Sequence, residues 1–318
     1  MAGYTSYDDL VVTTLEKRSK KAADNILDNN VLLMRLKERG HVVKLSGGRV
    51  IVEEIHYKGG SNFKRYSGYE ALDTTPIQFH TAAEYPWAQA SVTVSASGLE
   101  MRSNMGETQM IPLLKSRIEA AEKDFQNNIS TDVYSDGTAS GGKQIEGLDA
   151  KVAEAPSTGV VGGIDRASNT WWENNHSGDE TISATTVLGL MQTEWLSVVR
   201  GADHPTVIVA DANLFGFFWD ALSEIQRITS PEKGTSGFRS LEFAGPSGFA
   251  PVFYDSACQT NRMYFLNENY LFFKVHSKAF FSPLPEVRAV NQDALVVPIV
   301  FQGNLTMSNS ELQTVLWT

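Results

Sequence analysis

The strongest periodic pattern in the chain lies between residues 107 and 133, where apolar side chains recur every three or four residues. This spacing places them on one face of an α-helix about 40 Å long, with Pro112 in the first turns, where a proline costs least. A helix of this length must bury its stripe against a sheet or a neighbouring molecule. The stripe comprises Ile111, Leu114, Ile118, Ala121, Phe125, Ile129 and Val133.

The first hundred residues predict helix followed by strand. Residues 9–39 read as a helix that Asn29 and Asn30 divide in two and that Gly40 ends. Residues 42–57 are β-rich, and Gly47 and Gly48 within them predict a tight hairpin between two short strands. The alternating pattern of residues 90–101 predicts another strand.

Between these strand regions, residues 58–76 are rich in Gly, Ser and Tyr and poor in aliphatic side chains. A loop of this length without a core of its own is uncommon in a compact monomer and usually lies on a partner. Its tyrosines and Arg65 are residue types that are enriched in interfaces.

The second half of the chain predicts an α/β layer and then strands. Residues 183–200 form an amphipathic helix pattern, and the buried strand 206–210 leads through Asp211, as a cap, into a helix ending near Arg227. From Phe249 onward short strands dominate. The order of elements predicts an α+β protein.

Composition places the chain among ordinary folded proteins, since 42% of its 318 residues are hydrophobic and 20% are charged. The single cysteine, Cys258, cannot form an internal disulfide, and no Cys/His cluster has zinc-binding spacing. Residues 1–10 lack a signal-peptide pattern, and no apolar run approaches the roughly 20 residues that span a bilayer. We therefore expect a soluble, unexported protein.

Charge is unevenly distributed along the chain. The net charge is -10, yet residues 17–65 contain 12 Lys/Arg against 5 Asp/Glu. A basic N-terminal arm could lie on the acidic body of a neighbouring copy or on nucleic acid, whereas a solvated helix face explains the same excess without a partner. The basic cluster comprises Lys17, Arg18, Lys20 and Lys21.

Motifs that would carry chemistry are weak. Residues 137–144 match the phosphate-loop pattern except that Gln144 replaces Ser/Thr, and they follow a helix instead of a strand, which favours a surface loop. Ser247 misses the spacing of a nucleophile elbow by one residue. Trp171 and Trp172 could stack on a sugar or a base, although such pairs more often anchor a loop. The six histidines include no His-x-x-x-His pair, so the sequence predicts no enzyme, metal or cofactor site.

The order of segments resembles the major capsid proteins of tailed bacteriophages with the Hong Kong 97 fold. The similarity is carried by residues 106–137, which resemble the spine helix, and by residues 145–175, which resemble the stretch where the spine gives way to the axial domain. It covers nearly the whole chain but includes no catalytic signature. Encapsulin nanocompartments share this fold.

The resemblance implies a domain plan for an α+β, Hong Kong 97-type fold. Residues 1–41 would be the N-terminal arm, 42–103 the extended loop with flanking peripheral strands, and 104–140 the spine helix. Residues 141–275 would form the axial domain, and 276–318 the closing strands of both domains. Since the chain opens on the arm, any scaffold is expected to be a separate protein.

The function that the resemblance implies is self-assembly into pentamers and hexamers of an icosahedral virion shell around double-stranded DNA, in the cytoplasm of the host bacterium. The expected partners are further copies of the chain, a portal, and scaffold or decoration proteins, without a membrane. An encapsulin-like shell is the first alternative, and a hydrolase or ATPase using residues 137–144 or Ser247 is the second. The Lys–Asn crosslink of some family members does not carry over, because nothing marks its acceptor or catalytic acid.

Three sets of residues are the candidates for assembly. The spine residues Leu114, Ile118, Phe125 and Ile129 are expected to pack on the closing strands near residues 295–301, and the basic cluster of the arm to contact a neighbour or DNA. The expected contacts of the extended loop with a neighbouring subunit are Lys58, Phe63, Lys64, Arg65, Tyr66 and Tyr69.

Overall fold

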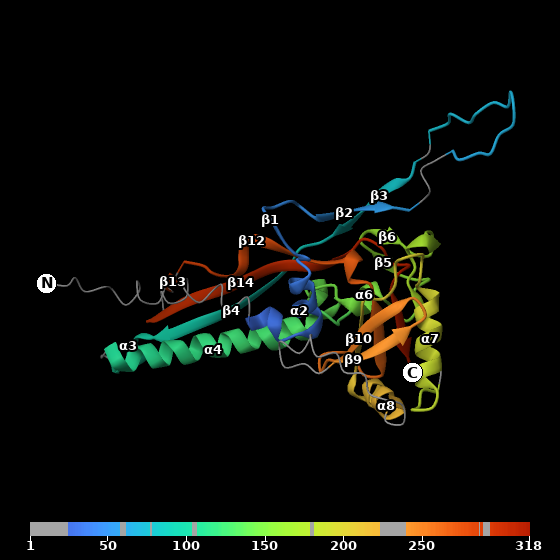
Figure 1. Ribbon diagram of the computed structural model, residues 1–318. Helices are drawn as coiled ribbons and strands as arrows, with labels where there is room; N and C mark the ends of the chain where they lie inside the picture. The colour runs from blue at the N-terminus through green and yellow to red at the C-terminus, as the bar shows by residue number, and fades with distance from the viewer. Residues whose placement is uncertain are drawn as a thin grey trace.

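The computed structural model describes residues 25–57, 62–76, 78–103, 107–178, 181–222, 240–285, 287–288 and 293–318. A long sheet backed by one long helix extends to one side, and a compact sheet with shorter helices forms the other side (Figure 1). The described helices are α2 (Val31–Glu38), α3 (Gly98–Ser103), α4 (Glu107–Asp132), α5 (Ala139–Gly142), α6 (Leu148–Lys151), α7 (Val187–Ser197) and α8 (Ala212–Leu222), with 3-10 turns at Thr170–Trp172 and Glu268–Tyr270. The α+β class is confirmed.

The strands form two larger sheets and two ribbons. The long sheet has the order β1-β12-β14-β13, with β4 on the other side of β14, and the compact sheet has the order β7-β15-β11-β8-β10-β9. The ribbons are β2-β3 and β5-β6. The strands are β1 (Val42–Leu45), β2 (Ile51–His56), β3 (His80–Tyr85), β4 (Ala88–Ser97), β5 (Val160–Val161), β6 (Ile164–Asp165), β7 (Asn175–Ser177), β8 (Val207–Ala210), β9 (Ser240–Gly245), β10 (Gly248–Tyr254), β11 (Arg262–Leu266), β12 (Leu271–Pro283), β13 (Val287–Arg288), β14 (Ala294–Met307) and β15 (Thr314–Trp317).

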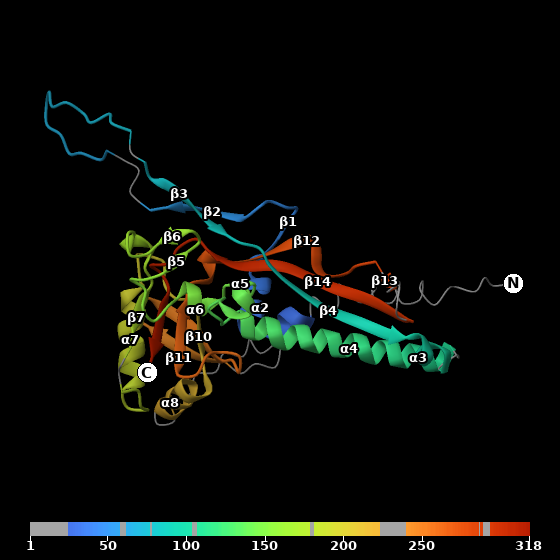
Figure 2. The ribbon, with the colours of Figure 1, turned by 180° about the vertical axis from the view of Figure 1, so that it is seen from behind.

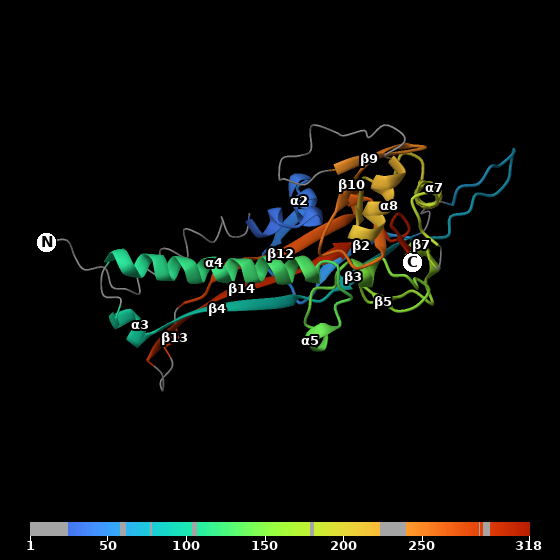
Figure 3. The same ribbon diagram turned by 90° about the horizontal axis from the view of Figure 1, so that it is seen from below.

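Helix α4 covers one face of the long sheet, lying along β4 and β14 (Figures 2 and 3). Burial alternates along the first part of β14, where Leu295, Val297, Ile299 and Phe301 are buried and each residue between two of them is partly exposed. This alternation is the pattern of an antiparallel strand with one covered face. The long sheet and α4 therefore form a two-layer unit.

The compact sheet is covered on both faces. All four residues of β8 are buried, because α7 and α8 pack on one face and the core shared with the long sheet lies against the other. Asp211 caps α8 as expected, since its Oδ1 accepts a hydrogen bond from the amide of Leu214 at 2.9 Å. Helix α8 is described as far as Leu222.

The predicted helices of the N-terminal half and the spine are confirmed where they are described. Helix α4 spans Glu107–Asp132, and α2 begins after Asn30, whose side chain accepts a hydrogen bond from the amide of Leu33 at 3.1 Å. Gly40 follows α2 with a φ of +76°, a conformation that glycine adopts without strain.

The hairpin predicted at Gly47 and Gly48 is wrong. Strand β1 pairs in parallel with β12, whereas β2 pairs antiparallel with β3, so the two glycines connect strands of different sheets. Both glycines have positive φ and supply the turn, but the partners of the strands are chosen by packing against distant segments. The strand predicted over residues 90–101 also ends early, at Ser97, where α3 begins.

The helix predicted over residues 183–200 is shorter in the structure, spanning Val187–Ser197. Throughout the described residues, no helix combines the length and the apolar character that crossing a membrane would require.

Candidate assembly surfaces

The excursion between β2 and β3, residues 57–79, leaves the body of the molecule and reaches into solvent (Figure 1). Its described part, 62–76, is not paired into any sheet. The Asn62 side chain holds its two branches together by donating hydrogen bonds to the carbonyls of Asp73 (3.1 Å) and Thr75 (2.7 Å). Residues 62–76 therefore have a defined local shape but contribute none of the buried core.

The expected loop contacts are exposed on this excursion. Tyr69 is fully exposed and Phe63 is 78% exposed, while Lys64 forms an ion pair of 3.5 Å with Glu70. The Arg65 guanidinium lies 5.8 Å from the centre of the Phe63 ring. Tyr66 is also exposed, and Lys58 lies outside the described residues. Exposed large apolar side chains clustered on one projection are typical of interaction surfaces.

The ribbon β2-β3 attaches the excursion to the body. The ring of Tyr57 stacks on Trp171 with centroids 4.8 Å apart, and the amide of Glu84 donates to the carbonyl of Gly162 at 2.8 Å. Gly162 has a φ of +58°, and a Cβ added there would lie 2.7 Å from the Cβ of Ala83. A glycine is therefore required for this close approach.

The tandem tryptophans anchor the loop that receives the ribbon. Trp172 is buried and its indole donates to the carbonyl of Val161 at 3.0 Å, while Trp171 is partly buried beneath Tyr57. The anchoring interpretation is confirmed, because neither ring forms an open stacking platform.

Three of the four predicted spine residues, all of which belong to α4, have buried side chains. Ile118, Phe125 and Ile129 are each at most 3% exposed, and the side chain of Leu114 lies outside the described residues. The Phe125 ring meets Phe281 edge to face at 5.3 Å, and Phe281 in turn stacks on Phe301 at 5.1 Å. The stripe thus contacts the long sheet through β12 as well as β14.

The helix α2 is fixed to the body at both ends by acidic residues. The Asp255 carboxylate accepts hydrogen bonds from the Val31 amide at 3.4 Å and from the Tyr134 hydroxyl at 2.8 Å, so it joins α2 to the end of the spine. Burial raises the pKa of Asp255 above its ordinary value. The basic cluster Lys17, Arg18, Lys20 and Lys21, which precedes α2, lies outside the described residues.

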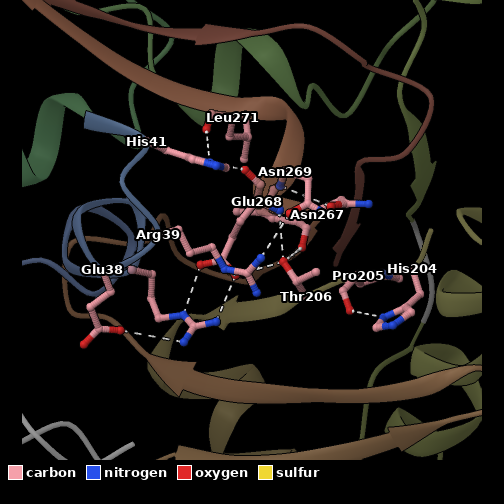
Figure 4. A network of polar contacts seen from close by, with 12 residues as sticks. Glu38, Arg39, His41, His204, Pro205, Thr206, Asn267, Glu268, Asn269 and Leu271 are labelled. Atoms are coloured by element: carbon pink, nitrogen blue, oxygen red, sulfur yellow. Dashed lines mark hydrogen bonds and ion pairs between the residues drawn. The ribbon is translucent and has the colours of Figure 1, made fainter. Parts of the chain in front are cut away.

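At the other end of α2, the buried carboxylate of Glu268 receives two arginines (Figure 4). Arg35 donates to it from Nε at 3.0 Å and from Nη2 at 2.9 Å, and Arg39 lies 2.9 Å away. Thr206 adds a hydrogen bond of 2.8 Å, which ties β8 of the compact sheet to the same group. Sequence analysis missed this anchor, because Arg35 and Glu268 are 233 residues apart and no local pattern marks them.

The residues considered for catalysis have structural roles. Residues 137–144 follow the C-terminal end of α4, and Gln144 donates to the carboxylate of Asp132. Ser247 accepts a hydrogen bond from the Trp195 indole at 2.9 Å. Among the described residues, no group of three or more His, Cys, Asp or Glu side chains could hold a metal ion.

A buried lysine lies within the stretch from 145 to 175. Lys151 is fully buried, and burial lowers its pKa to about 8. Its Nζ lies 3.7 Å from a carboxylate oxygen of Glu146 and 5.0 Å from the centre of the Tyr85 ring, and its carbonyl accepts a hydrogen bond from Arg166. These contacts enclose the amine within the core, so it holds β3 and this stretch together.

Comparisons with known proteins give structural but not sequence relatives. No family model matches the chain, and none of the curated proteins compared with it does. The capsid asymmetric unit of cyanophage A-1(L) is similar at 16% identity and a TM-score of 0.62, covering 87% of this chain and 90% of the other. The capsid of Myoviridae phage XM1 is similar at 12% identity and 0.52, covering 89% and 91%.

A cellular shell protein is similar as well. The SrpI encapsulin of Synechococcus elongatus PCC 7942 has a TM-score of 0.53 at 8% identity, covering 87% of this chain and 84% of the encapsulin. All three similarities extend over 87% to 89% of this chain. The chain therefore has the fold of the tailed-phage major capsid proteins, the Hong Kong 97 fold.

Proposed function

We propose that this chain is the major capsid protein of a tailed bacteriophage, assembling as pentamers and hexamers into an icosahedral virion shell around double-stranded DNA. The observation that carries the proposal is the excursion, whose exposed aromatic side chains contact no core of their own chain. A projection of this kind is stable in water, and its exposed apolar side chains would be buried when it lies on another subunit. The capsid fold supplies the setting for that contact.

The two-sheet architecture supports the domain plan. The long sheet with α4 would form the peripheral domain, the compact sheet with α7 and α8 the axial domain, and residues 1–41 the arm. Within this plan Phe63, Lys64, Arg65, Tyr66 and Tyr69 contact a neighbouring subunit, and Lys58 joins them.

The arm is proposed to contact an acidic neighbouring surface or the packaged DNA through its basic cluster. The anchoring of α2 by Asp255 and Glu268 supports this role, because it fixes the position from which residues 1–24 depart. Such contacts weaken as salt rises. A portal, together with scaffold or decoration proteins supplied separately, would complete the assembly in the host cytoplasm.

An encapsulin-like nanocompartment is the second candidate function, favoured by the similarity to the SrpI encapsulin. The expected absence of enzymatic activity applies to both candidates. Their difference lies in what the shell encloses.

The proposal is tested by expressing the chain and examining it by electron microscopy and sedimentation. Closed shells or ring-shaped capsomers are expected, and a monodisperse small oligomer would overturn the shell function. Particles isolated from the natural source should protect double-stranded DNA from nuclease. Particles that enclose a protein cargo in place of DNA would instead support the nanocompartment function.

A further inference from the structure

Two histidines from opposite strands lie side by side where the excursion leaves the ribbon. His56 ends β2 and His80 begins β3, and the two are direct partners in the antiparallel pairing. Their ring centroids are 3.9 Å apart. The next residue pair is joined by a hydrogen bond from the Tyr57 amide to the Phe79 carbonyl at 3.2 Å. The histidines therefore occupy a non-hydrogen-bonded position, where opposing side chains approach most closely.

The face that carries these histidines is exposed and acidic. Along β2, Ile51, Glu53 and Ile55 face inward, so Glu54 and His56 share the outer face. Glu84 is exposed on the same face of β3, and neither strand contains a lysine or an arginine. The local charge therefore favours a cation over an anion.

The pair is held in place before any ligand binds. The Phe79 ring lies 3.9 Å from His80 and stacks near His56 at 6.3 Å, centroid to centroid. The Tyr57–Trp171 stack fixes the adjacent residue to the body. Side chains whose backbones are already positioned lose less entropy when they bind a common ligand.

We infer that His56 and His80 form a binding site for a divalent transition-metal ion, with Zn²⁺ as the probe. Imidazole nitrogen suits such ions, and water can fill the remaining positions. The site needs only two histidines from the chain, which agrees with the finding that the described residues hold no ready group of three or more ligands.

A metal ion at this position would act as a clip. It joins β2 to β3 at the last pair of the ladder, and the segment it closes is the whole excursion. Closing a long loop reduces the conformations available to its two ends. The bound ion would therefore stiffen the base of the excursion, independently of whether the subunits assemble.

Equilibrium dialysis of the full chain against Zn²⁺ tests the site, with variants His56→Asn and His80→Asn. His176→Asn removes an exposed histidine elsewhere and is the matched control. Each variant of the pair should lower the affinity by more than about tenfold, since even outer partners of metal ligands are worth that much. The control should bind as the natural chain does. Undiminished binding in either variant of the pair, or an equal loss in the control, would overturn the site.

A second readout follows the clip itself. Zn²⁺ should slow tryptic cleavage after Lys64 and Arg65 in the natural chain and in His176→Asn, but not in His56→Asn. Protection that persists in His56→Asn would count against the inference. Neither readout requires particles, so failure here is distinct from failure of the shell function.

Discussion

At the scale of single residues, the buried carboxylate of Glu268 joins distant parts of the chain. It is completely buried and is shared by Arg35, Arg39 and Thr206. A buried charge is tolerated only when its partners are present, and the loss of one partner leaves the others uncompensated. Glu268 therefore helps to hold α2 in position, together with Asp255 at the other end of the helix.

The variant Glu268→Gln should lower the free energy of unfolding of the subunit by roughly 3 to 5 kcal/mol, because two arginines lose their counter-charge. Glu311→Gln is the control, since its ion pair with Arg200 has both side chains about half exposed. That change should cost under about 1 kcal/mol. Urea unfolding of dissociated subunits measures both, and equal losses would contradict the anchoring role.

At the scale of elements, α4 and the long sheet stabilise each other through one buried stripe. Phe125→Ala removes a ring that is 3% exposed and should cost roughly 3 to 5 kcal/mol of unfolding free energy. Lys123→Ala, on the exposed face of the same helix, should cost under about 0.5 kcal/mol. Unfolding midpoints of the two variants provide the comparison. If Lys123→Ala lowered the unfolding midpoint more than Phe125→Ala, the assignment of residues 107–132 as the spine would be wrong.

At the scale of the whole molecule, the proposed role of the excursion predicts that folding and assembly can be separated. Deletion of residues 59–73 should abolish particles while leaving the subunit folded, because no residue of the described part belongs to the buried core. Electron microscopy and the unfolding midpoint of the subunit measure the two effects. Tyr69→Ser should reduce particle yield in the same direction, since that ring is fully exposed in the subunit. Shells of natural size from the deletion variant would show that the excursion is not part of the assembly interface.

The sequence by itself determined the features that arise from neighbouring residues. The periodic stripe predicts α4, the Asn29–Asn30 break and Gly40 delimit α2, and Asp211 marks the start of α8. The excursion was also predictable, because a segment poor in aliphatic side chains cannot bury itself. In each case the interactions that decide the structure span only a few residues, so their signal is present in the local pattern.

Only the tertiary structure decided which distant segments meet. The turn at Gly47 and Gly48 looks like a hairpin, yet β1 pairs with β12 and β2 with β3, because strand pairing is selected by burial on the whole sheet. Arg35 meets Glu268, and His56 meets His80, through the same long-range pairing. The histidines look scattered in the sequence because a pattern read along one strand carries no information about the residue opposite, which the register alone supplies.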